Sequence, residues 1–317
     1  MGKHYRSSRG GRQAKKPLDM REQARRWIEA KAQRGQTKAS GARLRGDRTV
    51  AHYAGNLGRA AEAIQQTHGT SKLKDIDQDQ AQAYIDARAA EGLSPKTCQA
   101  YAQALQTLPS IEQLEAPSRS AADKPTNSRA YTDRQISEVQ RYLPNRASLS
   151  AKIMRESGCR TKDLATIRLA NERPLQAVRL DQLHDDRFSG REDWINVTFI
   201  GKGGHEYEST ISQGTATELK HYRLATPKTF TDRGKLKNHP IKQQYNIPAG
   251  KDFSDAWRQA SKRSLGFNHG AHGLRHTFAQ VRVEELQQQG FTWTQALERT
   301  SEQIGHYRYE EIYTYLR

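Results

Sequence analysis

The spacing of apolar and polar positions predicts helices throughout the first third of the chain. Apolar side chains recur every three or four residues, which places them on one face of a helix. Asp77 and Ser94 stand at N-cap positions, and Pro95 fits a first helical turn. No segment alternates with a period of two, so we expect a small all-helical bundle. The predicted helices cover about residues 18–34, 49–67, 77–92 and 94–108.

From Tyr131 onward the pattern combines helices with one strand pair. Residues 194–200 alternate and are rich in β-branched side chains, and residues 207–211 can run back beside them. Gly201-Lys202-Gly203-Gly204 lies between them, so a β-hairpin with Lys202 at its tip is predicted. We therefore expect a mainly α fold with a small β-hairpin or sheet, an α+β arrangement in this half. Predicted helices cover about residues 131–143, 148–156, 215–224, 253–264, 272–289 and 294–304.

Composition shifts divide the chain into parts. Residues 1–16 are basic and contain no acid, which predicts a disordered arm. Residues 115–130 are rich in Ala, Pro, Ser and Asn, which is typical of a linker. The sequence thus predicts a helical domain at 17–114 and a second domain at 131–317. Two further segments, residues 171–193 and 226–249, are expected to be irregular, and the basic residues of the second could follow a DNA backbone.

The net charge of the chain indicates the class of binding partner. The 317 residues include 52 Lys and Arg against 35 Asp and Glu, a formal net charge of +17. Such a surplus favours a polyanionic partner, although a basic soluble protein with no nucleic-acid role is the plain alternative. Cys98 and Cys159 form no Cys-x-x-Cys pair, which argues against a disulfide framework or a cysteine zinc site. No apolar run has the roughly 20 residues that span a bilayer, so we expect no membrane partner and a cytoplasmic location.

Two basic side chains stand where a phosphate could bind. His272 and Arg275 are three residues apart at the start of a predicted helix, so both point the same way near its positive end. A zinc site through His272 and His276 is the weaker interpretation. Gly273 occupies the place of the glutamate in a His-Glu-x-x-His motif, and no third ligand is evident.

Other candidate residues have ordinary structural explanations when each is taken alone. Arg160 and Asp163 follow a helix-ending glycine, Gly158, and could form a surface ion pair. Lys202 could be a solvated turn lysine, since Gly-Lys-Gly-Gly is no Walker motif. His306 precedes several tyrosines that could serve in packing. The tyrosines are Tyr307, Tyr309, Tyr313 and Tyr315.

Together these motifs resemble the tyrosine recombinases, the phage-integrase family. The order Gly158-Cys159-Arg160…Asp163, Lys202 on a hairpin, His272-Gly273-Leu274-Arg275, Ile304-Gly305-His306 and a later tyrosine matches the family's boxes over residues 131–317. The family's nucleophile usually falls nine residues after the last histidine, which selects Tyr315, with Tyr313 in reserve. Residues 93–105 more faintly resemble the end of the family's core DNA-binding domain.

The resemblance implies an activity for each matched residue. The chain would cleave and rejoin DNA through a 3′-phosphotyrosine on Tyr315, for integration, excision or resolution. Arg160, Arg275 and His306 would hold the phosphate, with Asp163 orienting Arg160. His272 would accept the tyrosine proton, and Lys202 would protonate the leaving 5′-oxygen. Neither a metal nor another cofactor is implied.

The resemblance also implies partners. The first partner is double-stranded DNA, held between the two domains. The second is the chain itself, in a homo-tetramer on two DNA sites. The resemblance also allows for an accessory DNA-bending protein. Only Leu316 and Arg317 follow Tyr315, whereas the family usually continues into a tail that docks on a neighbour, so either the tail is missing or assembly uses other surfaces. The alternatives are a type IB topoisomerase and a non-catalytic DNA-binding protein with a relic site.

Overall fold

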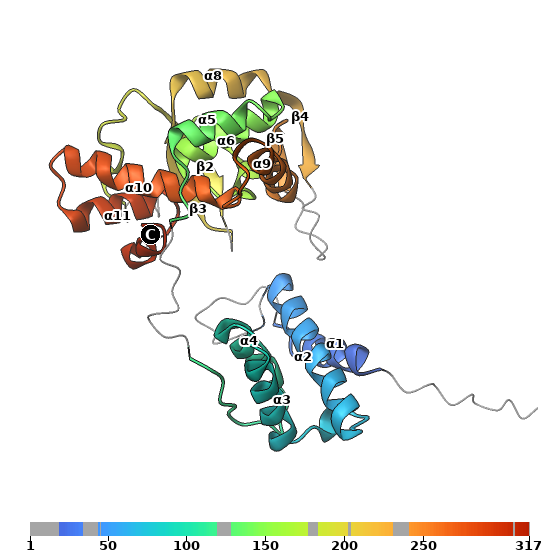
Figure 1. Cartoon of the computed structure of the whole chain (residues 1–317). Helices are drawn as coiled ribbons and strands as arrows, with labels where there is room; N and C mark the ends of the chain where they lie inside the picture. The colour runs from blue at the N-terminus through green and yellow to red at the C-terminus, as the bar shows by residue number, and fades with distance from the viewer. Residues whose placement is uncertain are drawn as a thin grey trace, which may run out of the picture. The chain divides into compact units, whose positions relative to one another are not determined.

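The computed structural model of the chain describes residues 19–33, 44, 46–118, 128–176, 183–201, 204–230, 241–306 and 308–316. The predicted arm at 1–16, the middle of the predicted linker and Lys202 lie outside these ranges. Contacts divide the chain into two compact units, residues 1–124 and 125–317 (Figure 1). The division falls inside the segment 115–130 that the sequence assigns to a linker.

The described residues of the first unit form helices and no strand, as predicted. Asp19, Asp77 and Ser94 cap three of its helices by accepting hydrogen bonds from backbone N–H groups three residues later. Apolar faces of all four α-helices meet in one core that includes Met20, Leu57 and Ile85. The helices are α1 (Met20–Ala30), α2 (Asp47–His68), α3 (Gln78–Ala90) and α4 (Pro95–Leu105), with a 3-10 turn at Leu73–Asp75.

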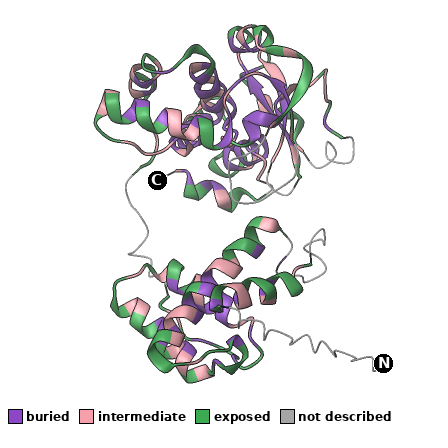
Figure 2. Ribbon diagram, turned by 90° about the vertical axis from the view of Figure 1, so that its right-hand side faces the viewer, coloured by how far each residue is buried: buried purple, intermediate pink, exposed green. Residues whose placement is uncertain are grey.

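The second unit places helices around a small antiparallel sheet. Its described residues contain α5 (Asp133–Gln140), α6 (Asn145–Ser157), α8 (Gln213–His221), α9 (Gly250–Leu265), α10 (His272–Gln288) and α11 (Trp293–Gln303). Short 3-10 turns cover η4 (Asp163–Thr166), η5 (Asp185–Phe188) and η6 (Tyr309–Thr314). Buried residues line the facing sides of these helices and the sheet (Figure 2).

The predicted β-hairpin is present. Strand β2 (Ile195–Ile200) pairs antiparallel with β3 (Glu206–Ile211), in a register that sets Ile200 opposite Glu206. The short strand β1 (Arg168–Leu169) adds to the other edge of β2, which gives the sheet order β1-β2-β3. Burial on both faces of β3 places this sheet inside the unit, where the candidate residues gather.

The prediction of a long loop at 226–249 was wrong for residues 226–230 and 241–245, which lie in strands, and residues 231–240 lie outside the described ranges. Residues Arg223–Phe230 form β4, which pairs antiparallel with β5 (Ile241–Tyr245). Because residues 225–229 of β4 are all exposed, the strand has no alternation of buried and exposed positions, and its sequence shows no alternation of apolar and polar residues that could indicate a strand. The helix predicted for 215–224 ends earlier, at His221, because the chain enters β4 at Arg223.

The segment 171–193 also has more structure than its polar sequence indicates. It contains η5, and Arg187 and Arg191 within it are buried. Arg187 pairs with Glu208 at 2.6 Å, and Arg191 pairs with Glu285 on α10.

Among the described residues no helix has the length and apolarity needed to cross a bilayer.

Candidate active site

Arg275 connects three helices of the second unit, α6, α10 and α11. Its side chain is fully buried in the first turn of α10. Nη1 donates to the Gly158 carbonyl, which follows α6, and Nη2 donates to the Ile304 carbonyl, which follows α11. The two distances are 2.5 and 2.9 Å. A guanidinium has five N–H groups, so these two bonds fix its plane and leave donors for an anion.

Arg160 and His306 contact each other from opposite ends of the unit's sequence. Arg160 Nη2 lies 3.0 Å from His306 Nε2. Because a guanidinium can only donate, Nε2 is the acceptor, and the neutral imidazole carries its proton on Nδ1. Burial, and then the charges of Arg275 and Arg160, lower the pKa of His306 to about 3, so it is neutral at pH 7.

Tyr315 is packed against these groups. Its hydroxyl lies 3.2 Å from His306 Nε2, and its ring lies over the Arg275 guanidinium, 5.1 Å from Cζ to the ring centroid. The ring also contacts His272 and, edge-on at 5.0 Å, His276. The side chain is buried, and its backbone is held by the bond from Gln280 Nε2 to the Tyr315 carbonyl.

The other tyrosines differ from Tyr315 in exposure. Tyr313, the reserve candidate, is 46% exposed, and Tyr309 is 36% exposed. Tyr307 lies outside the described residues. Tyr315, at 6% exposure, is therefore the described late tyrosine whose hydroxyl reaches His306.

His272 lies at the start of α10 beside the same guanidinium. Burial, and then the charges of Arg275 and of His276 when protonated, lower its pKa to about 3, and Arg129 and Arg160 act in the same direction. The imidazole is therefore neutral at pH 7. A neutral imidazole at this place can accept a proton.

Asp163 connects Arg160 to the sheet. Its Oδ2 accepts the Arg160 backbone N–H at 3.3 Å and lies 3.6 Å from Arg160 Nη1. The same oxygen accepts the hydroxyl of Tyr207 at 2.7 Å. The sequence does not indicate Tyr207 as a site residue, and it suggests His276 only as a zinc ligand. In the strand and helix patterns both occupy core positions, and only their polar atoms could have indicated more.

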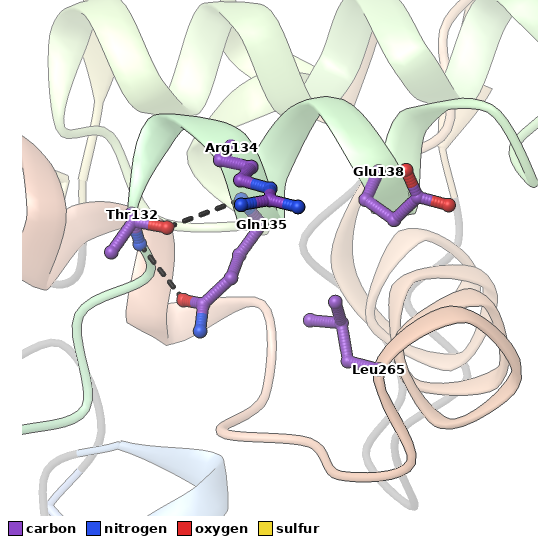
Figure 3. A pocket seen from close by; sticks show the side chains of 5 residues that line it. All are labelled: Thr132, Arg134, Gln135, Glu138 and Leu265. Carbon is purple, nitrogen blue, oxygen red and sulfur yellow. Dashed lines mark hydrogen bonds between the residues drawn. The ribbon is translucent and has the colours of Figure 1, made fainter.

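Within the described ranges no group of three His, Cys, Asp or Glu side chains is placed to hold a metal ion. A pocket of about 400 Å³ lies between α5 and the end of α9 (Figure 3). Its lining contains a Thr132–Gln135 capping box but none of the candidate residues. The candidate site is therefore the buried cluster around Arg275.

The known proteins that resemble this chain do so in structure. No protein-family model and no curated protein sequence matches it. The XerH site-specific recombinase bound to difH substrate matches with a TM-score of 0.56 and 16% identity, covering 96% of this chain and 95% of that one. A lambda integrase tetramer bound to a Holliday junction matches at 0.54 and 13%, covering 94% and 78%. The Tn1549 transposon integrase in complex with circular intermediate DNA matches at 0.50 and 15%, covering 95% of each.

At these identities the matches establish the fold. The chain has the tyrosine-recombinase fold, mainly α with two small antiparallel sheets, over nearly its whole length. The resemblance seen in the sequence is confirmed at that level. The structure brings together Arg160, Asp163, His272, Arg275, His306 and Tyr315, and leaves Tyr313 exposed.

Proposed function

We propose that this protein is a site-specific tyrosine recombinase that cleaves and rejoins DNA through a 3′-phosphotyrosine on Tyr315. The observation that carries the proposal is the position of Tyr315, whose hydroxyl lies 3.2 Å from His306 Nε2 and whose ring contacts Arg275 and His272, while Arg160 contacts the same His306 nitrogen. A phenol, a phosphate-binding guanidinium pair and a neutral base are the groups that metal-free phosphoryl transfer to a tyrosine requires.

Binding of the scissile phosphate would change the charge balance of the site. Burial first, and then the charges of Arg275 and Arg160 among others, lower the pKa values of both histidines. A phosphodiester would bring a negative charge beside His306, which would offset the effect of the arginine charges and favour the protonated imidazole of His306, while His272 stays neutral as the candidate base. Arg160 Nη2 would then exchange His306 for a phosphate oxygen, and His306 would become a donor to the phosphate.

Tyr315 needs a base, since a free phenol has a pKa of about 10 and is a weak nucleophile at pH 7. The neutral His272 would accept its proton as the hydroxyl oxygen attacks phosphorus. The two arginines would stabilise the charge that develops on the phosphorane-like transition state. Lys202 would supply the proton to the departing 5′-oxygen. Since the phosphodiester's energy is retained in the phosphotyrosine bond, rejoining would need no ATP.

Double-stranded DNA is the proposed substrate. The net charge of +17 favours binding to phosphate through counterion release. Each of the three matched solved structures is a complex with DNA, and one is a tetramer on a Holliday junction. We therefore propose that four copies of this chain act on two DNA sites, because exchange between two duplexes needs four strand cleavages.

The test is covalent capture of DNA. A bound site is first selected from a random duplex library, and duplexes are then prepared with a nick at successive positions across it. Cleavage near a nick releases a short fragment and traps the protein on DNA, which a denaturing gel shows as an adduct. The wild type and Tyr313→Phe should form the adduct, and Tyr315→Phe should not.

Other results would point elsewhere. Binding without any adduct from the wild type would indicate a DNA-binding protein with an inactive site. Adduct formation with relaxation of supercoils, but without joining of two sites, would indicate a topoisomerase. An adduct from Tyr315→Phe would overturn the assignment of the nucleophile, and mapping the DNA-linked peptide would then identify the residue used.

A further inference from the structure

Tyr207 lies on β3 beneath the candidate site. Its side chain is almost fully buried, and its ring stacks on Phe199 of the neighbouring strand at a centroid distance of 5.3 Å. A phenylalanine would fill the same apolar space. The hydroxyl therefore needs its own explanation, because a buried polar group is costly unless it is hydrogen-bonded.

The Tyr207 hydroxyl donates to Asp163 Oδ2 at 2.7 Å. Burial first, and the nearby Asp163 carboxylate second, raise the pKa of Tyr207 well above its ordinary value, so the phenol keeps its proton. The same Asp163 oxygen accepts the Arg160 backbone N–H and lies near the Arg160 guanidinium. Tyr207 thus fixes the carboxylate that faces Arg160.

The Tyr207 ring also supports the backbone before His306. Gly305 has φ +69°, and a Cβ built there would lie 2.7 Å from Tyr207 Cδ1 and Cγ. The Gly305 backbone therefore packs directly on the ring. A Cβ built on Gly201, at the end of β2, would lie 3.3 Å from Tyr207 Cε1. One side chain thus contacts the segments that carry Arg160 and His306.

We propose that Tyr207 is a positioning residue that holds Arg160 and His306 in the positions from which they would bind the scissile phosphate. Its hydroxyl acts on Arg160 through Asp163, and its ring acts on His306 through Gly305. Together these two contacts of Tyr207 hold Arg160 Nη2 at 3.0 Å from His306 Nε2. The inference rests on the proposed function, since it assigns a role toward the phosphate that Arg160 and His306 would bind.

The first test is Tyr207→Phe, with Tyr245→Phe as a matched control. Tyr245 is also fully buried, and its hydroxyl also donates to a carboxylate, Glu172 Oε2, at 2.7 Å. Both variants lose the same kind of bond, so both should lose similar thermal stability. Single-turnover adduct formation on a nicked duplex should fall about tenfold, a barrier increase of about 1.4 kcal/mol, in Tyr207→Phe alone. The Kd for DNA should not change in either.

A double-mutant cycle with Asp163→Asn separates positioning from general packing. If Tyr207 acts through Asp163, the double variant should form the adduct about as slowly as the slower single variant. Rate losses that multiply would show that the hydroxyl acts independently of Asp163 and would overturn the proposal. Wild-type rates in Tyr207→Phe would overturn it as well.

An independent readout covers the case in which the wild type forms no adduct. Inorganic phosphate should raise the unfolding midpoint above that in sodium chloride of equal ionic strength, and Arg160→Ala should remove that rise. Tyr207→Phe should reduce it and Tyr245→Phe should keep it. With no adduct but this pattern, the recombinase function fails and the positioning role stands. A phosphate response that is absent from the wild type, or unchanged in Tyr207→Phe, overturns the positioning role.

Discussion

The Tyr315 hydroxyl and His306 Nε2 lie 3.2 Å apart within one chain. Tyr315 is nine positions after His306 in the sequence, and the chain reaches it through η6, where the Tyr315 backbone N–H donates to the Ile312 carbonyl at 2.7 Å. Gln280 on α10 holds the Tyr315 carbonyl from the other side. The candidate nucleophile, Tyr315, therefore lies beside His306 and Arg275 of its own chain.

This placement predicts cleavage in cis. Arg160→Ala retains Tyr315 but lacks a phosphate ligand, whereas Tyr315→Phe retains the ligands but lacks the hydroxyl. The Arg160 side chain is 27% exposed, so its removal should leave the core intact. A mixture of the two variants should give no DNA adduct on a denaturing gel, although each should bind DNA. Adduct formation in the mixture would mean that the tyrosine crosses between protomers.

The two histidines predict an acid-sensitive fold. Their pKa values are about 3 in the folded protein and about 6.5 in an unfolded chain. Between these limits the unfolded chain binds more protons, so stability is fully present above about pH 6.5 and falls as the pH falls. Each group contributes at most about 1.4 kcal/mol per pH unit, and His306 less because it is more exposed to solvent.

Urea unfolding at pH 7 and pH 4.5 measures this effect. The midpoint of the wild type should fall more between the two pH values than that of His272→Gln or His306→Gln, and the double variant should be the least sensitive. Parallel losses in all four proteins would show that neither imidazole is buried in its neutral form.

The sequence predicts much of this arrangement because the decisive signals are local. N-caps such as Ser94 and glycines such as Gly158 mark helix ends by backbone chemistry that needs no tertiary context. The alternation of residues 195–200 predicts β2 in the same way. The motif order alone also selects Arg160, Arg275, His306 and Tyr315, whose contacts the structure then shows.

What the sequence does not predict depends on partners far along the chain. Tyr207 occupies a core position in a strand pattern, and nothing local indicates that its hydroxyl meets Asp163, 44 residues earlier. Strand β4 is exposed and lacks an apolar pattern, so only its pairing with β5 defines it. Arg187 and Arg191 appear as loop residues because their acidic partners lie on β3 and α10.

Gly305→Ala should impair both stability and cleavage. The φ of +69° costs an alanine roughly 1–2 kcal/mol, and the clash with the Tyr207 ring adds about 1–3 kcal/mol. Gly290 is a matched control, since its φ is +91° and a Cβ there meets nothing within 4 Å. Gly290→Ala should show the first cost alone and cleave at the wild-type rate. Equal losses of thermal stability in the two variants would mean that the ring does not constrain Gly305.

Arg191 predicts that the segment 183–193 is required for a stable second unit. The side chain is buried, holds Glu285 through several hydrogen bonds at 2.9–3.2 Å, and donates to the Glu156 carbonyl at 2.8 Å. Burial lowers the pKa of Arg191 to about 10, so the guanidinium stays charged at pH 7. It also lies over the Trp194 ring at 4.2 Å.

Arg191→Met should therefore cost about 3 kcal/mol in urea unfolding, the lower end for breaking a buried pair, because Glu285 retains access to water. The control is Arg141→Met, which breaks the Arg141–Glu138 pair on the surface, where the arginine side chain is 75% exposed. Its cost should stay below about 1 kcal/mol. If the two variants unfolded at the same urea concentration, Arg191 would be no more important to the fold than a surface arginine, and the segment would be dispensable for stability.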